Sequence, residues 1–118
     1  MLSWSPKEQF EKVTAAGGFV VQAHPYRLAP WIPEAIIYPD CCEAFELYNA
    51  HNVPEVNAQA VEYATKHGIH GTGGTDAHGP VQPRGGMIFE KKWESIADYI
   101  AAVRSGTGYR IITEFAER

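Results

Sequence analysis

An aspartate and a histidine two positions apart, Asp76 and His78, are the residues of this chain best suited to chemistry. They follow the run Gly73-Gly74-Thr75, whose glycines would let the backbone turn tightly enough for both side chains to reach one site or two neighbouring sites. A carboxylate oxygen and an imidazole nitrogen together suit Zn²⁺, Mn²⁺ or iron. The alternative is that Asp76 caps a turn or a short helix and that His78 lies in a surface loop.

Other polar residues follow apolar runs of the kind that form buried strands. His24 comes directly after residues 19–23, while Glu46 and Asn49 lie within and just after residues 44–48. In parallel α/β folds, reactive groups gather beyond the carboxyl ends of the strands, so three successive strands would each bring a polar group to one face. His24 could instead satisfy buried backbone groups, and Glu46 could instead pair with a nearby cation.

Two arginines lie where they could serve the same face of the fold. Arg27 is three residues beyond His24, and Arg84 lies in a glycine- and proline-rich loop over residues 79–86. The planar guanidinium group binds phosphate through two parallel hydrogen bonds, so both are candidate substrate-binding residues. The alternative for each is a solvated surface arginine. His51 could extend the site, or it could simply lie on the surface of a loop.

The elements that must position these residues alternate along the chain. This alternation predicts parallel α/β units in one domain spanning residues 1–118. The proline-rich stretch 26–40 is typical of a long loop, with room for a turn of helix at 34–37. We expect helices over residues 5–16, 52–66 and 95–104, and strands over residues 19–23, 44–48, 69–73, 86–89 and 109–112.

The starts and ends of the helices carry local signals. Ser5 and Glu8 form the pattern of a capping box, and Asn52 with Glu55 forms the same kind of pattern at the second helix. A glycine follows each helix, as is common at helix C-termini. The apolar face that the last helix should turn inward consists of Ile96, Tyr99, Ile100 and Val103.

The composition excludes several classes of protein. A chain of 118 residues has room for one compact domain, and its 45% hydrophobic content is that of an ordinary globular protein. The net charge of −4 argues against a broad nucleic-acid-binding surface. Neither an apolar run of the roughly 18 residues that cross a bilayer nor a secretory signal core occurs. The adjacent Cys41 and Cys42 are expected to be free thiols, so we expect a cytoplasmic protein.

Several of these segments together resemble the polymerase-and-histidinol-phosphatase (PHP) family of phosphoesterases. Residues 17–25 are similar to the family strand that ends in AHP, and residues 45–49 to the strand often written IEVYN. Residues 73–78 resemble the closing GSDAH motif, and residues 84–89 resemble the segment that follows it. The order and spacing agree from about Ser5 to Ile112, which is nearly the whole chain.

This resemblance implies a fold and a set of ligands. The family fold is a distorted seven-stranded β/α barrel that holds up to three metal ions at the carboxyl ends of its strands and usually hydrolyses phosphate esters. The chain would then be a half barrel of parallel strands that contains the C-terminal βα units. By the same resemblance, His24, Asp76 and His78 would bind Zn, Mn or Fe, and Asp76 and His78 would be the catalytic residues.

The remaining candidate residues would serve the substrate or support the ligands. Arg27 and Arg84 would bind the phosphate of a phosphorylated small molecule or nucleotide. Glu46 and Asn49 would lie behind the metal ligands and hold them in place.

One part of the family pattern is missing from the sequence. The family opens with an H-x-H strand, but no H-x-H occurs in this chain and no histidine precedes His24. The metals could therefore be absent from the chain alone, and we expect it to form a homo-oligomer or to pair with a separate N-terminal half. Two alternatives remain: a catalytically silent truncated module that acts by oligomerisation or partner binding, and a fragment of a TIM-type amidohydrolase.

Overall fold

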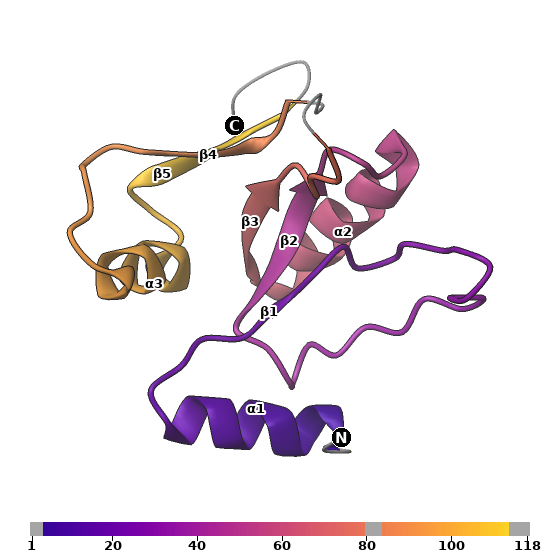
Figure 1. Ribbon diagram of the computed structural model, residues 1–118, viewed down its shortest axis with the longest axis horizontal. Helices are drawn as coiled ribbons and strands as arrows, with labels where there is room; N and C mark the ends of the chain where they lie inside the picture. Colours follow the sequence, from indigo (N-terminus) through magenta and orange to yellow (C-terminus); the bar gives the residue numbers. More distant parts are fainter. Residues whose placement is uncertain (1–3, 80–83, 114–118) are drawn as a thin grey trace.

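Three parallel strands form the sheet that carries the candidate residues. The computed structural model describes residues 4–79 and 84–113. In it β1 (Val21–Gln22), β2 (Ala44–Asn49) and β3 (His70–Gly74) pair in that order, all parallel. Figure 1 shows β2 and β3 running side by side with their carboxyl ends toward the same edge. The predicted parallel pairing of the first three strands is confirmed, although the first strand is shorter than the predicted 19–23.

Helix α2 (Pro54–His67) covers one face of this sheet and makes its main core. The fully buried Phe45 of β2 stacks on Tyr63 with ring centroids 5.8 Å apart, and Ala60 and Ala64 let the helix approach closely. The helix ends at Gly68, which takes the left-handed conformation expected of a C-terminal glycine. Its N-cap is Val53 and not the predicted Asn52, whose side chain is used elsewhere.

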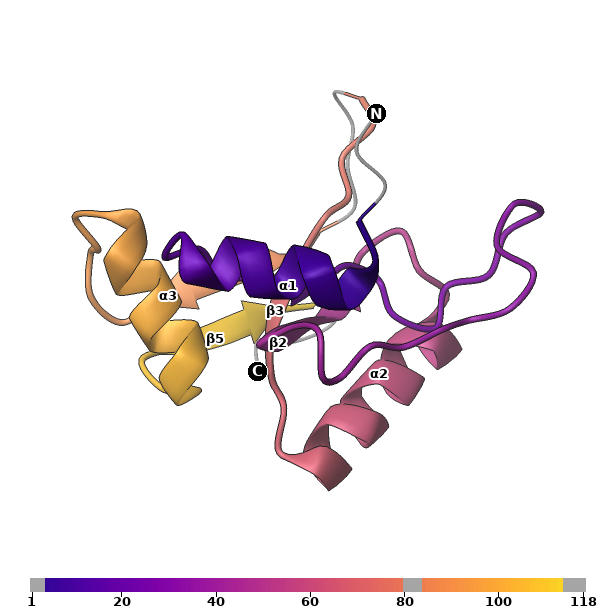
Figure 2. The same ribbon diagram turned by 90° about the horizontal axis from the view of Figure 1, so that it is seen from below.

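Helix α1 (Pro6–Ala15) starts as its sequence predicts. The backbone N–H of Glu8 donates to Ser5 Oγ at 3.1 Å, and the Glu8 carboxylate accepts from the N–H of Ser5, so the capping box is complete. No residue within α1 is buried. Figures 1 and 2 place α1 beneath the amino ends of the strands, which is the side away from the candidate residues.

The last two strands depart from the expected parallel arrangement. β4 (Gly86–Phe89) and β5 (Tyr109–Ile112) pair antiparallel in a separate two-stranded sheet. The prediction of parallel strands throughout is wrong here because α3 (Ile96–Ser105) and its terminal Gly106 return the chain along β4 itself. The antiparallel return is a matter of tertiary structure that the alternation of elements does not reveal.

Helix α3 buries only part of its predicted face. Val103 is fully buried, and Tyr99 and Ile100 are half-buried, but Ile96 is 63% exposed. The inward placement predicted for Ile96 is therefore wrong, because this side chain in the first turn of α3 faces mostly solvent. The helix still joins the two sheets, since it packs on β3 and leads into β5.

The long loop between β1 and β2 contains no helical turn at residues 34–37. The side chain of Gln22 ties the loop to β1 instead: its amide donates to the carbonyl of Ile36 at 3.0 Å and accepts from the N–H of Tyr38 at 2.9 Å. The loop leaves large apolar side chains in solvent, with Leu28 60% and Trp31 80% exposed.

The described residues form a mixed α/β structure and not a closed barrel. The partial barrel implied by the family resemblance is therefore not confirmed, whereas the α/β class and the parallel three-stranded sheet are. Within the described ranges, no helix has both the length and the apolar character needed to cross a membrane.

Candidate functional site

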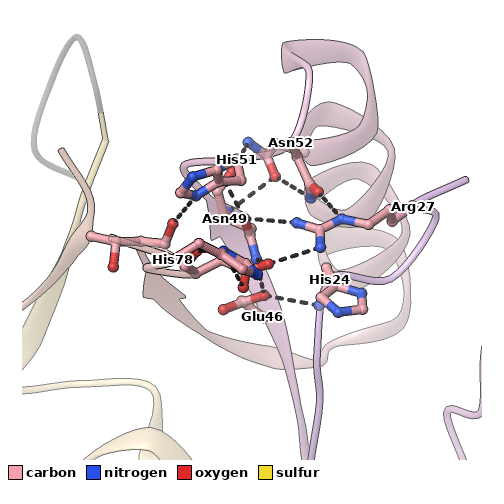
Figure 3. Close-up of polar contacts among 10 residues, drawn as sticks. His24, Arg27, Glu46, Asn49, His51, Asn52 and His78 are labelled. Carbon is pink, nitrogen blue, oxygen red and sulfur yellow. Dashed lines mark hydrogen bonds and ion pairs between the residues drawn. The ribbon is translucent and has the colours of Figure 1, made fainter. Parts of the chain in front are cut away.

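Polar side chains from the carboxyl ends of the three parallel strands meet in one hydrogen-bonded group (Figure 3). Their contacts run from the turn after β1, through the end of β2 and the start of α2, to the turn after β3. We call this group the strand-end cluster. It consists of Arg27, Glu46, Asn49, Asn52, Asn57 and Asp76.

Arg27 supplies the positive charge of the strand-end cluster. Its guanidinium group is 2.8 Å from Asp76 Oδ2, and it also donates to Asn52 Oδ1 at 2.7 Å and to Asn49 Oδ1 at 2.9 Å. The side chains of Arg27 and Asp76 are only 23% and 24% exposed. These three contacts use three of the five N–H groups of the guanidinium, which is thereby held in one orientation.

Asn49 lies at the centre of the cluster and is 1% exposed. Its side-chain amide donates to Glu46 Oε1 at 2.9 Å and to Asp76 Oδ2 at 3.1 Å. Its Oδ1 accepts from Arg27 and from the backbone N–H of His51. All four hydrogen-bonding positions of the side chain are therefore used, which is the condition for burying an asparagine without cost.

Asn57 connects helix α2 to the end of β2. Its Oδ1 accepts from the backbone N–H of Asn49 at 3.1 Å, and its Nδ2 donates to the backbone carbonyl of Asn49 at 3.1 Å. Asn52 also donates to Asn57 Oδ1 at 2.9 Å. Since α2 continues the chain that leaves β2, these bonds fix the direction in which Asn49 presents its amide.

Glu46 joins the turn after β1 to the cluster. Its Oε1 accepts from the backbone N–H of His24 at 2.9 Å as well as from Asn49. A Cβ added to Gly74 would be 3.2 Å from Glu46 Oε2, so the glycine makes room for this carboxylate. On the other side, burial raises the pKa of Tyr99 of α3, and the charge of Glu46 raises it further. The prediction that Glu46 points away from its apolar neighbours into the site is consistent with these contacts.

The backbone of Asp76 has a φ of 54°, in the left-handed region that residues other than glycine adopt less often. His24 also has a positive φ, of 31°. Strained backbone of this kind is found more often at functional sites than elsewhere. Gly74 is still a strand residue of β3, one position beyond the predicted strand, and the left-handed backbone falls at Asp76 and not at the glycines before it.

The carboxyl group of Asp76 is charged at neutral pH. Hydrogen bonds from Arg27, and then from Asn49, lower the pKa of this group below its usual value, and the charge of Arg27 adds to the effect. Both donors contact Oδ2. The other oxygen, Oδ1, lies 3.7 Å from Nδ1 of His78.

Two histidine rings lie next to each other beside Asp76. His78 is mostly exposed, and its Nδ1 is 2.5 Å from the backbone carbonyl of Asp76. The ring of His51 packs edge-on against His78 with centroids 5.4 Å apart, and its Nδ1 bonds to the carbonyl of Thr75. The structure therefore brings His51 to the site, which the sequence left open between site and loop surface.

The fit to a metal ion is incomplete. The donor types are suitable, since carboxylates and imidazoles bind Zn, Mn and Fe. Across residues 4–79 and 84–113, however, no three His, Cys, Asp or Glu side chains are arranged to hold an ion together. Asp76 is moreover paired with Arg27. In this arrangement the described residues do not by themselves fit a tightly bound metal, which typically needs three or four protein ligands.

The structure brings most of the predicted site residues together. Asp76, His78, Glu46, Asn49 and Arg27 are within the cluster or in contact with it, and His24 touches it through its backbone. Arg84 is exposed and lies two residues before β4.

Asn57 was missed by the sequence analysis, and Asn52 was given the wrong role. The available signal for Asn57 was its position on the apolar face of α2, in line with Ala60 and Ala64. A polar residue on a buried helical face usually has a specific partner. Nothing in the sequence around Asn52 shows whether its side chain caps a helix or accepts a hydrogen bond from Arg27.

An apolar groove of about 680 Å³ lies apart from these polar contacts, between α2, β3 and β5. It shares Asn57 with the strand-end cluster. Its apolar lining includes Leu47, Val61, Ile69 and Ile111. Its lining also contains Glu62 and His70 but no lysine or arginine, so it lacks the cationic side chains that usually bind phosphate.

The comparison with protein families agrees with the resemblance drawn from the motifs. Residues 54–81 match the family model described as PHP-associated. The matched segment begins with α2 and contains Asn57, Asp76 and His78. No curated protein and no solved structure gives a significant match. The match covers about a quarter of the chain and supports a relationship to the PHP family.

Proposed function

We propose, from its relationship to the PHP family, that this chain is the C-terminal portion of a metal-dependent phosphoesterase and supplies part of its active site. The observation that carries the proposal is the strand-end cluster. Residues that follow three successive parallel strands contact one another at the edge of the sheet where α/β enzymes place their reactive groups. The matched segment contributes Asp76 and His78 to this edge.

The completed site would draw further ligands from outside the described residues. Asp76 and His78 are the closest pair of candidate ligands, with Oδ1 and Nδ1 3.7 Å apart, and His24 is the third candidate. The expected cofactor of the completed site is Zn, Mn or Fe. An N-terminal half of the domain, on the same or on another polypeptide, or a second copy of the chain would provide the ligands that the H-x-H strand supplies in the family.

The cluster residues of this chain position the candidate ligands. Arg27 and Asn49 hold Asp76 in one orientation, and Glu46 holds the backbone of His24. Arg84 is a candidate for binding the substrate phosphate. Arg27 could contribute to the same task through the two N–H groups that its three contacts within the cluster do not use.

Reconstitution tests this proposal. The chain is mixed with a polypeptide that carries the H-x-H half of a PHP domain, and Mn²⁺-dependent hydrolysis of a phosphomonoester is measured. We expect hydrolysis that neither polypeptide shows alone and that Asp76→Ala abolishes. Asp40→Ala, which removes an exposed carboxylate outside the strand-end cluster, is the matched control and should leave hydrolysis unchanged.

A second candidate function is a catalytically silent module that acts by oligomerisation or partner binding. The observation that favours it is the pairing of Asp76 with Arg27, which satisfies the carboxylate without a metal. If reconstitution gives no hydrolysis at any metal concentration, the phosphoesterase proposal is abandoned for this one.

A further inference from the structure

We propose that Arg27 is a built-in counter-ion for Asp76, which takes the place of a divalent cation there and must be displaced before a cation can bind. This inference rests on the proposed function only in taking Asp76 as a candidate metal ligand. It explains why the described residues do not fit a bound ion in the present arrangement.

The first support is the way in which the guanidinium is held. Asp76 accounts for one of its three contacts, and the other two are made by the neutral amides of Asn49 and Asn52. An arginine that only followed the charge of Asp76 would not need these amides. Because Asn52 orients the guanidinium without contacting Asp76, and Asn49 bridges the two charged groups, the guanidinium stays beside the carboxylate and opposes a second cation by charge repulsion.

The second support is the difference between the two oxygens of Asp76. Oδ2 accepts from both Arg27 and Asn49, whereas Oδ1 lies toward His78. A cation that approaches Asp76 from the exposed side of His78 reaches Oδ1 first. It can bind both oxygens only after Arg27 has withdrawn from Oδ2.

The third support is burial. The side chains of Arg27 and Asp76 are each about three-quarters removed from solvent, so water screens the repulsion between the guanidinium and an incoming cation less than it would at the surface. The same burial makes the displacement of Arg27 unfavourable, since its charge must then find other partners.

The test is a titration of the full chain with Mn²⁺, followed by calorimetry and by the electron paramagnetic resonance of the free ion. Wild type is compared with Arg27→Gln, which removes the charge. We expect Arg27→Gln to bind Mn²⁺ at least tenfold more tightly than wild type. Adding Asp76→Asn to Arg27→Gln should remove this gain.

Two further variants sharpen the result. Asn52→Ala removes one amide that orients the guanidinium but keeps both charges, and we expect it to bind Mn²⁺ a few-fold more tightly than wild type. Arg104→Gln removes an arginine that pairs with Glu43 away from the site, and it should leave the affinity unchanged. If Arg27→Gln does not fold by circular dichroism, Asn52→Ala carries the test.

Equal or weaker Mn²⁺ binding by Arg27→Gln would overturn the inference, and so would a lack of binding by every variant, since Arg27 would then not be what keeps the ion away. These outcomes are independent of hydrolysis. Arg27→Gln can bind Mn²⁺ more tightly even if the chain forms no active enzyme with an N-terminal half. Conversely, reconstitution can give hydrolysis even if Arg27→Gln binds Mn²⁺ no more tightly than wild type.

Discussion

Two arginine–carboxylate pairs in this molecule are built in opposite ways. Arg104 of α3 meets Glu43 in a parallel bidentate arrangement, with Nε and the terminal nitrogen each 3.0 Å from a carboxylate oxygen. Arg27 makes a single contact of 2.8 Å with Asp76 and gives its other contacts to Asn49 and Asn52. The Arg104 side chain is 55% exposed and that of Arg27 23%, whereas the two carboxylates, Glu43 and Asp76, are 23% and 24% exposed.

The comparison shows that ideal geometry and functional importance need not coincide. The Arg104–Glu43 pair has the better two-point geometry, but the Arg104 side chain is more than half exposed, so its charge remains solvated when the pair breaks. The Arg27–Asp76 pair shares its partners with buried amides, so removing one member leaves several polar groups unsatisfied. The contribution of an ion pair to stability therefore depends more on how many buried groups bond to it than on the geometry of the pair.

The largest effect should follow from removing the centre of the strand-end cluster. Asn49→Ala leaves Glu46, Asp76 and Arg27 each without one partner, and we expect it to lower the free energy of unfolding by about 2–4 kcal/mol. Urea denaturation followed by circular dichroism measures this. A loss no larger than that of an exposed asparagine would show that the cluster is not cooperative.

A smaller effect is expected at the link to α2. Asn57→Ala removes the two hydrogen bonds that bracket the backbone of Asn49, at a cost of about 1–3 kcal/mol in the free energy of unfolding. Gln59→Ala, on an exposed position of the same helix, is the control and should have little effect. Similar losses of unfolding free energy in the two variants would mean that helix propensity explains the result, and not the two hydrogen bonds to the backbone of Asn49.

Arg27→Lys tests whether the fork of the guanidinium matters in addition to its charge. Lysine keeps the charge beside Asp76 but cannot reach the amides of Asn49 and Asn52 in the same geometry, so we expect a loss of about 1–2 kcal/mol in the free energy of unfolding. Thermal and urea denaturation give the value. If this variant is as stable as wild type, the charge of Arg27 alone accounts for its contribution to stability.

The smallest effect is expected at the exposed pair. Arg104→Lys and Arg104→Gln should lower the urea midpoint less than Arg27→Lys does, at low and at high salt, because the Arg104 side chain is 55% exposed and its loss leaves a single carboxylate, that of Glu43, without this partner. A loss as large as that of Arg27→Lys would reverse the comparison and make bidentate geometry the deciding factor.

Much of the local structure could be predicted from short stretches of sequence. The capping box of α1, the glycine that ends α2 and the parallel order of the first three strands all agree with prediction. The candidate residues at the strand ends also lie together, because parallel strands bring their carboxyl ends to one edge whatever the detailed packing.

The predictions that failed concern contacts between distant segments. The antiparallel return of β5 along β4, the exposure of Ile96 and the strand position of Gly74 all depend on which surfaces meet after folding. A Cβ on Gly73 would collide with Ile111 of β5 at 2.4 Å, so this glycine makes room for a neighbouring strand. The residues next to Gly73 do not show whether a glycine is required there to make room for a strand or to form a turn.

The helices, the strands and the edge at which the polar residues gather could be predicted from the residues alone, because these features follow from hydrogen bonds and side-chain periodicity over a few residues. Only the tertiary structure decided that Arg27 would meet Asp76, and that Asn52 would hold a guanidinium and not cap a helix. These partners lie 49 and 25 positions apart in the chain. Which donor reaches which acceptor over such distances is set by how the loops close and not by local pattern.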